Sequence, residues 1–296
     1  MTKIPERLLR QRGRHALVDG IPFVLPVDSQ DSPALMAVFP IDAGKAAALL
    51  PGTELKPLRL WGDRGALVVT VIDYRSTDIG RYIEFSIAIA CTHGARTAPR
   101  LLPALLTRPW GTGQYVLDLP VSTEVSVKGG KGIWGMPKHQ ASLDFRIGDR
   151  TVSSQYDLDG RLAMRIEIDK PRFAVLPISA AGANYCAFRG MLMKSSVYFT
   201  ATAGLRLPGT RSARLTLGDH PRMAPLHGLD IGSRPLATVW LPTSAGTLDD
   251  HLEAWFIHFD QPPETVPEGL ESVAGLGQGQ EWPAPPDPAL ADRARA

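Results

Sequence analysis

Residues 130–141 read GKGIWGMPKHQA, and this stretch is the most informative part of the chain. Its glycines predict a loop at Gly129–Gly132, which is followed by apolar side chains, a proline and a lysine. Pro137 has a fixed φ and no amide donor, so it suits the first position of a strand. Lys138 would then project rigidly from the start of that strand.

Lysine is scarce in this chain, which sets Lys138 apart. Of the 32 basic residues only eight are lysines, and arginine supplies the rest of the positive charge. A lone lysine beside a turn is usually a solvated surface charge. Lys194, the only other lysine among apolar residues, is interpreted as a side chain whose stem lies along the edge of an element. The apolar neighbours of Lys138, namely Ile133, Trp134 and Met136, instead favour a buried amine.

The composition is that of a globular protein. The 296 residues are 44% hydrophobic, which is enough for one large β-rich domain or two small ones. Only 21% are charged, the net charge is +2, and the basic residues are scattered singly, so no nucleic-acid partner is indicated. Cys91 and Cys186 lie in apolar runs and are interpreted as buried, reduced thiols.

The ends of the chain and its apolar runs bear on location. The N-terminal residues are charged and lack the apolar stretch of a signal peptide. No apolar run approaches the roughly 20 residues that span a bilayer. We therefore expect a cytoplasmic protein without a membrane partner. No metal site is predicted, because no carboxylate or cysteine completes a set with His251 and His258.

Runs of β-branched and apolar residues predict a strand-rich body. A short helix is expected over 43–50, capped by Asp42 and stopped by Pro51. A second short helix is expected over 101–106. The expected strands are 34–40, 66–74, 81–91, 115–121, 140–147, 151–156, 162–168, 197–207, 214–217 and 236–241.

The strongest helical pattern lies near the end of this body, over Leu248–Phe259. Leu252, Trp255 and Phe256 fall on one face at helical spacing, and two aspartates stand near the expected N-terminus. This segment is therefore predicted to be a helix.

Composition divides the chain into three parts. Residues 1–29 are polar and rich in arginine, and we interpret them as an N-terminal arm. Residues 30–259 form the single β-rich domain. Residues 260–296 are rich in proline and glycine, and they are predicted to be an extended or disordered tail.

Three sequence elements resemble the acetoacetate decarboxylase family. The first is the glycine-rich turn followed by Ile133, Trp134, Pro137 and Lys138. The second is a Tyr-x-Glu after a glycine, read here as GRYIE over 80–84, and the third is LGDHP over 217–221. They occur in the family's order, and the resemblance covers roughly residues 30–258.

The resemblance implies a fold, an assembly and a reaction. The fold is mostly β (a β-rich α+β class), a cone-shaped β-barrel with a few peripheral helices, and the barrels assemble into homo-oligomers. The reaction is the decarboxylation of a β-keto acid by a lyase without a cofactor. A lysine forms a Schiff base with the ketone, and its nitrogen accepts electrons as the bond to the carboxylate breaks.

The resemblance also assigns roles to residues. Lys138 is the expected Schiff-base lysine, and Glu84 is the expected carboxylate that moves protons or orients substrate. A lysine normally titrates near 10.4, so about one in 10³ is neutral at pH 7, and burial favours the neutral form. The side chains expected to line the substrate pocket are Tyr82, Trp134, Met136 and His139. Of these, His139 is interpreted as a polar neighbour rather than a general base.

Two departures from the family's pattern open alternatives. His139 stands where many members carry a second lysine. Pro40 stands where our alignment expects an arginine that holds the substrate carboxylate, and proline offers neither charge nor donor. The leading alternative is therefore an aldolase-dehydratase that uses pyruvate through the same lysine. The other is a keto-acid-binding domain without catalysis.

Overall fold

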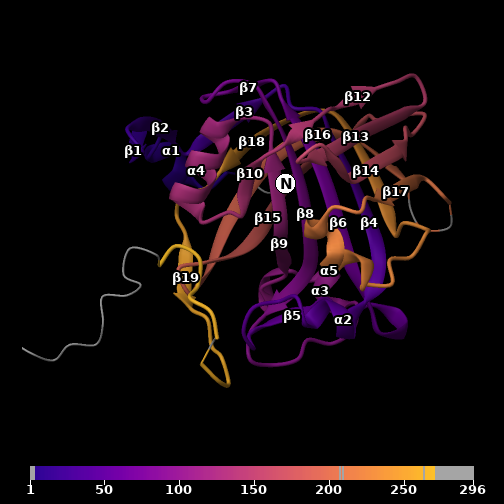
Figure 1. The fold of residues 1–296 in the computed structure, drawn as a ribbon. Coiled ribbons are helices and arrows are strands. Elements are labelled where there is room, and N and C mark those ends of the chain that lie inside the picture. Colours follow the sequence, from indigo (N-terminus) through magenta and orange to yellow (C-terminus); the bar gives the residue numbers. More distant parts are fainter. Residues whose placement is uncertain (1–3, 207, 209, 263, 271–296) are drawn as a thin grey trace, which may run out of the picture.

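The computed structural model of the chain describes residues 4–206, 208, 210–262 and 264–270. Strands dominate this part of the chain and form sheets of two, twelve and five strands (Figure 1). Helices are few and short. The predicted β-rich class with a few peripheral helices is thereby confirmed.

The largest sheet closes into a barrel. Seven of its strands follow one another in space, and the last pairs with the first. Their spatial order is β16 (Met191–Arg206), β15 (Leu176–Phe188), β9 (Gly113–Val121), β8 (Tyr82–His93), β6 (Arg64–Tyr74), β4 (Ala34–Asp42) and β18 (Ala237–Leu248). Most pairs are antiparallel, whereas β15 and the short strand β10 (Lys138–Gln140) run parallel to β9.

Smaller elements surround the barrel. The rest of the largest sheet is β10 together with β3 (Val27–Gln30), β5 (Leu55–Pro57), β7 (Ser76–Thr77) and β19 (Glu253–Phe256). The two-stranded sheet is β1 (Arg14–Val18) and β2 (Ile21–Leu25). The five-stranded sheet is β11 (Ser142–Leu143), β12 (Arg146–Ile147), β13 (Thr151–Leu158), β14 (Arg161–Asp169) and β17 (Ala213–Leu217). The helices are α1 (Glu6–Arg10), α2 (Ala43–Ala47), α3 (Leu102–Leu105), α4 (Glu124–Trp134) and α5 (Ala224–His227), with single 3₁₀ turns η1 (Trp61–Asp63), η2 (Arg108–Trp110) and η3 (Pro221–Met223).

The main hydrophobic core fixes which way the barrel strands face. It joins Phe85 and Ile87 of β8 to buried residues of the five-stranded sheet such as Tyr156 and Ile166. Because successive side chains of a strand point to opposite faces, Glu84 lies on the face of β8 turned away from this core. The barrel wall therefore presents one apolar face to the main core and a second face to the candidate site.

Most strand predictions are confirmed, because alternating or continuous β-branched runs mark these strands well. Thus 34–40, 66–74, 81–91 and 115–121 fall within β4, β6, β8 and β9 apart from single end residues. The cap prediction is also confirmed, since the Asp42 side chain accepts a 2.9 Å hydrogen bond from the Lys45 amide at the start of α2. The expected strand 140–147 is divided among β10, β11 and β12.

The loop predicted at Gly129–Gly132 is wrong, because these residues lie within α4. Glycine is a poor helix former, but here close neighbours leave no room for a side chain. A Cβ on Gly129 would lie 2.6 Å from the Phe23 ring, and one on Gly132 would lie 2.5 Å from Val18. These tertiary contacts require glycine at both positions. They could not be inferred from helix propensity, which depends on local sequence alone.

The helix predicted over Leu248–Phe259 is also wrong. β18 continues to Leu248, and after a loop β19 pairs with the edge of β16. The aspartates read as a helix start bind arginines instead: Asp249 pairs with Arg7, and Asp250 with Arg14. The helical spacing of the apolar residues was therefore coincidental.

Part of the predicted N-terminal arm forms regular secondary structure. Residues 4–25, which we term the N-terminal clasp, comprise α1 and the β1–β2 hairpin and lie beside α4 (Figure 1). The clasp is fastened by the Arg7 side chain, which binds both carboxylate oxygens of the buried Asp249. Most of the predicted tail, residues 271–296, lies outside the described residues. No helix in the described part is long and apolar enough to cross a membrane.

Candidate active site

A sharp turn after α4 places Lys138. The helix ends at Trp134, and Gly135 adopts the left-handed conformation (φ 61°) that glycine tolerates best. The Met136 amide then bonds back to the Gly130 carbonyl, 3.1 Å away. Lys138 follows as the first residue of β10, level with Leu119 of β9. The prediction that a lysine opens this strand after Pro137 is confirmed.

The Lys138 amine is buried and has polar partners on two elements. The residue is 5% exposed. Its Nζ lies 2.7 Å from Glu84 Oε2 on β8 and 3.0 Å from Ser126 Oγ on α4. It also lies 5.3 Å from the centre of the Tyr82 ring. The structure thus brings together three predicted site residues, Lys138, Glu84 and Tyr82.

Gly130 makes room for the lysine stem. A Cβ at this position would lie 2.3 Å from Cδ of Lys138 and 2.7 Å from its Cε. The backbone of α4 is therefore in direct contact with the lysine side chain, and only glycine permits this approach.

Two tyrosines, of which one was not predicted, complete the polar network. Tyr74 of β6 stacks on Tyr82 with ring centres 4.7 Å apart, and its hydroxyl donates to Glu84. The Ser126 hydroxyl accepts from Lys138 and donates to the oxygen of Tyr82. Burial, followed by the nearby Glu84 carboxylate, raises the pKa of both tyrosines well above the usual value. Both phenols therefore stay protonated at neutral pH.

Sequence reasoning missed Tyr74 and Ser126, although a signal for the first existed. Residues 66–74 and 81–91 were both expected to be strands, and only six residues separate them. Pairing them antiparallel puts Tyr74 level with Tyr82, as the structure has it. Ser126 could not be found in this way, because α4 was interpreted as a loop.

Trp134 and Met136 lie in an apolar cluster beside the site. They are 4% and 5% exposed and pack with Leu25, Leu119 and Cys186. The Trp134 indole donates a 2.8 Å hydrogen bond to the backbone oxygen of Asp249. This apolar cluster includes Leu119 of β9, which is level with Lys138, so it packs beside the strand that carries the lysine. Burial raises the pKa of Cys186 to about 12, although the nearby Lys138 opposes the shift.

His139 points away from Lys138. Because β10 alternates, the imidazole lies on the main-core face, where Nε2 is 2.9 Å from the Tyr156 hydroxyl. Its Nδ1 lies 3.5 Å from Asp118. The structure therefore does not bring His139 to the predicted pocket. Its interpretation as a polar neighbour fits this position better.

Pro40 also lies away from the lysine. Strand register places Ala34 level with Ile72 and hence with Glu84, whereas Pro40 stands six residues further along β4 and is level with Ala66. Six residues of strand correspond to roughly 20 Å. An arginine at position 40 would therefore not reach a carboxylate bound beside Lys138. The presence of Pro40 thus does not distinguish one keto-acid substrate from another.

The third sequence element, residues 217–221, makes contacts that hold η3 and does not contact the lysine. His220 accepts a hydrogen bond from the Arg222 amide and so caps η3, and its ring lies 3.4 Å from Asp159. Arg222 then donates from Nε to Asp118 at 2.8 Å.

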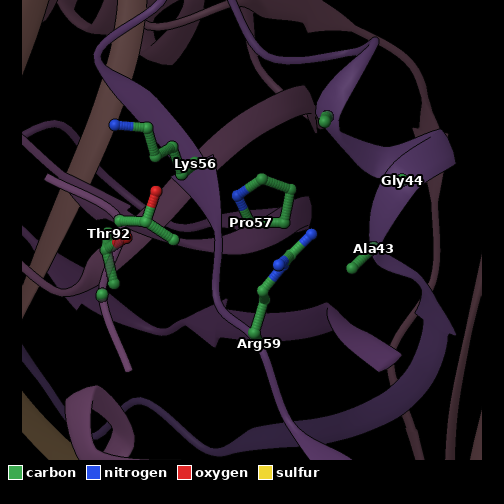
Figure 2. A pocket seen from close by; sticks show the side chains of 9 residues that line it. Ala43, Gly44, Lys56, Pro57, Arg59 and Thr92 are labelled. Atoms are coloured by element: carbon green, nitrogen blue, oxygen red, sulfur yellow. The ribbon is translucent and has the colours of Figure 1, made fainter. Parts of the chain in front are cut away.

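Two cavities lie outside the lysine site. One, of about 200 Å³, is lined by α2, β5 and neighbouring loops, with Lys56 and Arg59 on its wall (Figure 2). The other, of about 180 Å³, reaches Asp118 and Arg222. Within the described residues, no group of three or more histidine, cysteine or acidic side chains is placed to hold a metal ion.

Comparison with known proteins gives the family of this chain. The family model for acetoacetate decarboxylase (ADC) matches residues 9–252, which is most of the chain. The chain belongs to the acetoacetate decarboxylase family. A comparison with curated proteins gave no match.

Solved structures share the fold of this family member. A structure from structural studies of acetoacetate decarboxylase is 15% identical, with a TM-score of 0.57 over 78% of this chain and 89% of that one. An acetoacetate decarboxylase from Legionella pneumophila subsp. pneumophila str. Philadelphia 1 is 14% identical, with a TM-score of 0.53 over 76% and 85%. The enduracididine biosynthesis enzyme MppR, complexed with the condensation product of pyruvate and imidazole 4-carboxaldehyde, is 16% identical, with a TM-score of 0.53 over 77% and 89%. At these identities the likeness establishes the fold alone.

Proposed function

We propose that this family member is a lyase that decarboxylates a β-keto acid through a Schiff base on Lys138. The observation that carries the proposal is the buried Lys138 amine, 2.7 Å from the Glu84 carboxylate. A buried charge pair of this kind is costly unless it is well hydrogen-bonded, and such pairs are often kept for chemistry rather than for stability.

The first step needs a neutral amine. Glu84 is placed to take the proton of the Lys138 ammonium directly, because the two groups are already in hydrogen-bond contact. The freed amine attacks the ketone carbon and forms a carbinolamine. Glu84 then returns the proton to the departing hydroxyl, so that water leaves and a protonated imine remains.

The second step breaks the carbon–carbon bond. The electrons of the bond to the carboxylate move toward the iminium nitrogen, carbon dioxide leaves, and an enamine forms. A proton then adds to the enamine carbon, and water hydrolyses the imine. The balance is one β-keto carboxylate and one proton giving one ketone and one carbon dioxide, with Lys138 regenerated.

The remaining polar groups support these proton transfers. The protonated Tyr74 donates to Glu84, which orients the carboxylate toward the amine. Ser126, on α4, accepts a hydrogen bond from the Lys138 amine and is itself hydrogen-bonded to Tyr82. Preorganised donors of this kind lower a barrier because they need not reorient during the reaction.

A second candidate is an aldolase-dehydratase that joins pyruvate to an aldehyde. It uses the same first step, because pyruvate is also a ketone that Lys138 can attack. It is favoured by the likeness in fold to MppR, whose structure holds a condensation product of pyruvate. The third candidate, a keto-acid-binding domain without turnover, differs only in lacking the steps after binding.

Borohydride trapping tests the proposal. The protein is incubated separately with acetoacetate and with pyruvate, reduced with sodium borohydride, and its adduct is mapped by mass spectrometry. We expect a stable adduct on Lys138, and none in Lys138→Met. Lys194→Met is the matched control, because Lys194 is paired with a carboxylate at the same 2.7 Å but on the surface. This control should trap as much as the unmodified protein.

The outcomes separate the candidates. Release of carbon dioxide from acetoacetate, with an adduct on Lys138, supports the decarboxylase. An adduct with pyruvate, together with new ultraviolet absorbance on adding an aldehyde, supports the aldolase-dehydratase. Binding of either keto acid without an adduct would contradict both and leave the binding domain.

A further inference from the structure

The strand that carries Lys138 has a second anchor on its other face. β10 has only three residues, and among the described strands it pairs with β9 alone, so few backbone bonds hold it. Lys138 points to Glu84 and Ser126, whereas its neighbour His139 points into the main core. Whatever fixes the imidazole therefore also fixes the backbone from which the lysine projects.

The imidazole is held by a polar cluster from three other elements. His139 Nε2 lies 2.9 Å from the hydroxyl of Tyr156 on β13, a residue with no exposed surface. Tyr156 donates to Asp118 Oδ2 on β9 at 3.2 Å. Arg222 of η3 donates to Asp118 Oδ1 at 2.8 Å and so holds that carboxylate. We term these four residues the His139 cluster.

The direction of the hydrogen bonds fixes the orientation of the ring. Tyr156 donates to Asp118, so its oxygen can accept a second hydrogen bond, from Nε2–H of His139. The imidazole is then a donor through Nε2, and it can neither flip nor rotate without losing a buried bond. Tyr156 belongs to the five-stranded sheet, so the ring connects that sheet to the short strand β10.

Small displacements of a reacting group are costly. Lys138 must keep its amine within hydrogen-bond distance of Glu84 and also meet a substrate carbon. A misplacement of about 1 Å can lower a rate about 10²-fold. A three-residue strand tethered at one edge gives little resistance to such a shift by itself.

We propose that His139, held by Tyr156 and Asp118, is a positioning residue that aligns Lys138 for attack on the keto acid. This inference rests on the proposed Schiff-base function of Lys138. The imidazole acts through the backbone of β10 and touches no substrate. Arg222 contributes by orienting Asp118.

The test compares two buried tyrosines that each lose one hydroxyl. Tyr156→Phe removes the partner of His139, whereas Tyr185→Phe removes a 2.7 Å bond to the Gly111 carbonyl in the same core. The rate of trapping on Lys138 at saturating keto acid is measured beside the thermal unfolding midpoint. We expect both variants to lose stability, with the larger loss in Tyr156→Phe because its hydroxyl has two partners. Only Tyr156→Phe should slow trapping, by about 10- to 100-fold.

A second pair of variants keeps the test independent of Tyr156. His139→Leu removes the donor and should slow trapping to the same extent. His139→Gln offers an amide donor at a similar reach and should restore most of the rate. The double variant His139→Leu/Tyr156→Phe should be no slower than either single variant, because both remove the same bond.

The outcomes distinguish this inference from the proposed function. If the unmodified protein forms no adduct on Lys138, the Schiff-base function itself fails. If it forms the adduct, but Tyr156→Phe and His139→Leu trap at the unmodified rate, the function stands and the positioning role is overturned. Equal slowing by Tyr185→Phe would also overturn it, because the effect would then follow stability alone.

Discussion

At the scale of single residues, the site is a buried amine between a carboxylate and a hydroxyl. Sequence reasoning found Lys138, Glu84 and Tyr82, because each belongs to a short pattern on a recognisable strand. His139 points away from Lys138 because successive side chains of β10 alternate between two faces. The sequence prediction placed both side chains in one pocket because it did not take this alternation into account. Pro40 was misjudged because an alignment of sequence gives order along the chain but no register between strands.

Glu84→Gln tests the proton acceptor. The amide keeps the shape and one hydrogen bond but cannot take the ammonium proton from Lys138. We expect the rate of imine trapping on Lys138 to fall by about 10²- to 10⁴-fold. Glu124→Gln is the control, since it removes an exposed ion pair between Glu124 and Lys128, which contributes little. Trapping by Glu84→Gln at the unmodified rate would exclude Glu84 as the base.

His139 makes stability depend on pH. Burial lowers the pKa of His139, Arg222 and Lys131 add to this effect, and Asp118 opposes it, while Tyr156 accepts from its ring. In the unfolded chain a histidine titrates near 6.5, so below that pH the unfolded state binds the proton more readily than the folded state. The free energy of unfolding should therefore decrease as the pH falls through this range.

The measurement is denaturant unfolding at about pH 7.5 and about pH 5.5, on either side of the ordinary histidine pKa. The unmodified protein should lose more stability between these two conditions than His139→Gln, which has no group to protonate there. An equal loss in both proteins would show that other groups carry the pH dependence.

At the scale of elements, α4 is the part that sequence reasoning could not foresee. Its glycines weaken the local helical signal, and only contacts with the clasp and with Lys138 explain them. The opposite error occurred at residues 248–259, where a helical spacing was real but pairing of β19 with β16 prevailed. Strands of the barrel were easier to predict, because strands such as β4 and β6 alternate buried and half-buried residues along runs rich in apolar side chains.

Gly130→Ala tests the contact between α4 and the lysine. The added methyl would meet the flexible stem of Lys138, which can move aside. Alanine also favours the helix by about 1 kcal/mol over glycine. We expect a thermal unfolding midpoint close to that of the unmodified protein but a rate of trapping on Lys138 lowered by about ten-fold or more.

Gly132→Ala is the matched control in the same helix, because its methyl would meet Val18 of the clasp and not the lysine. It should lower stability, since overpacking costs about 1–3 kcal/mol, and leave trapping near the unmodified rate. If Gly130→Ala trapped as fast as Gly132→Ala, the close approach of helix and lysine would have no catalytic consequence.

At the scale of the whole molecule, the large sheet that forms the barrel brings the site residues together. Residues far apart in sequence, from Tyr74 on β6 to Lys138 on β10, meet because β6, β8, β9 and β10 are neighbours in one sheet. The clasp, from the N-terminal part of the chain, packs against α4. Barrel closure could be expected from the family resemblance. The clasp could not, because it depends on the ion pair between Arg7 and Asp249, which lie too far apart in the sequence to form a local pattern.

We expect the chain to self-associate. The resemblance implies homo-oligomers, and large apolar side chains are exposed in and beside α3, including Leu105 at 81% and Leu106 at 51%. Light scattering should give a mass above the 32.1 kDa of one chain. Leu105→Glu should lower that mass, whereas Leu17→Glu, which is also exposed but lies on β1, should not. A monomer in the unmodified protein would contradict this prediction.

The two faces of β10 also offer a route for protein engineering. Libraries that vary Asp118, Tyr156 and Arg222 would act on the lysine through His139, without altering Glu84, Ser126 or Tyr82 around the amine. A deletion of one residue just before Lys138 would exchange the two faces and present the imidazole where the amine now stands. Turnover and ligand preference could thus be selected in separate rounds, because one strand assigns them to opposite sides.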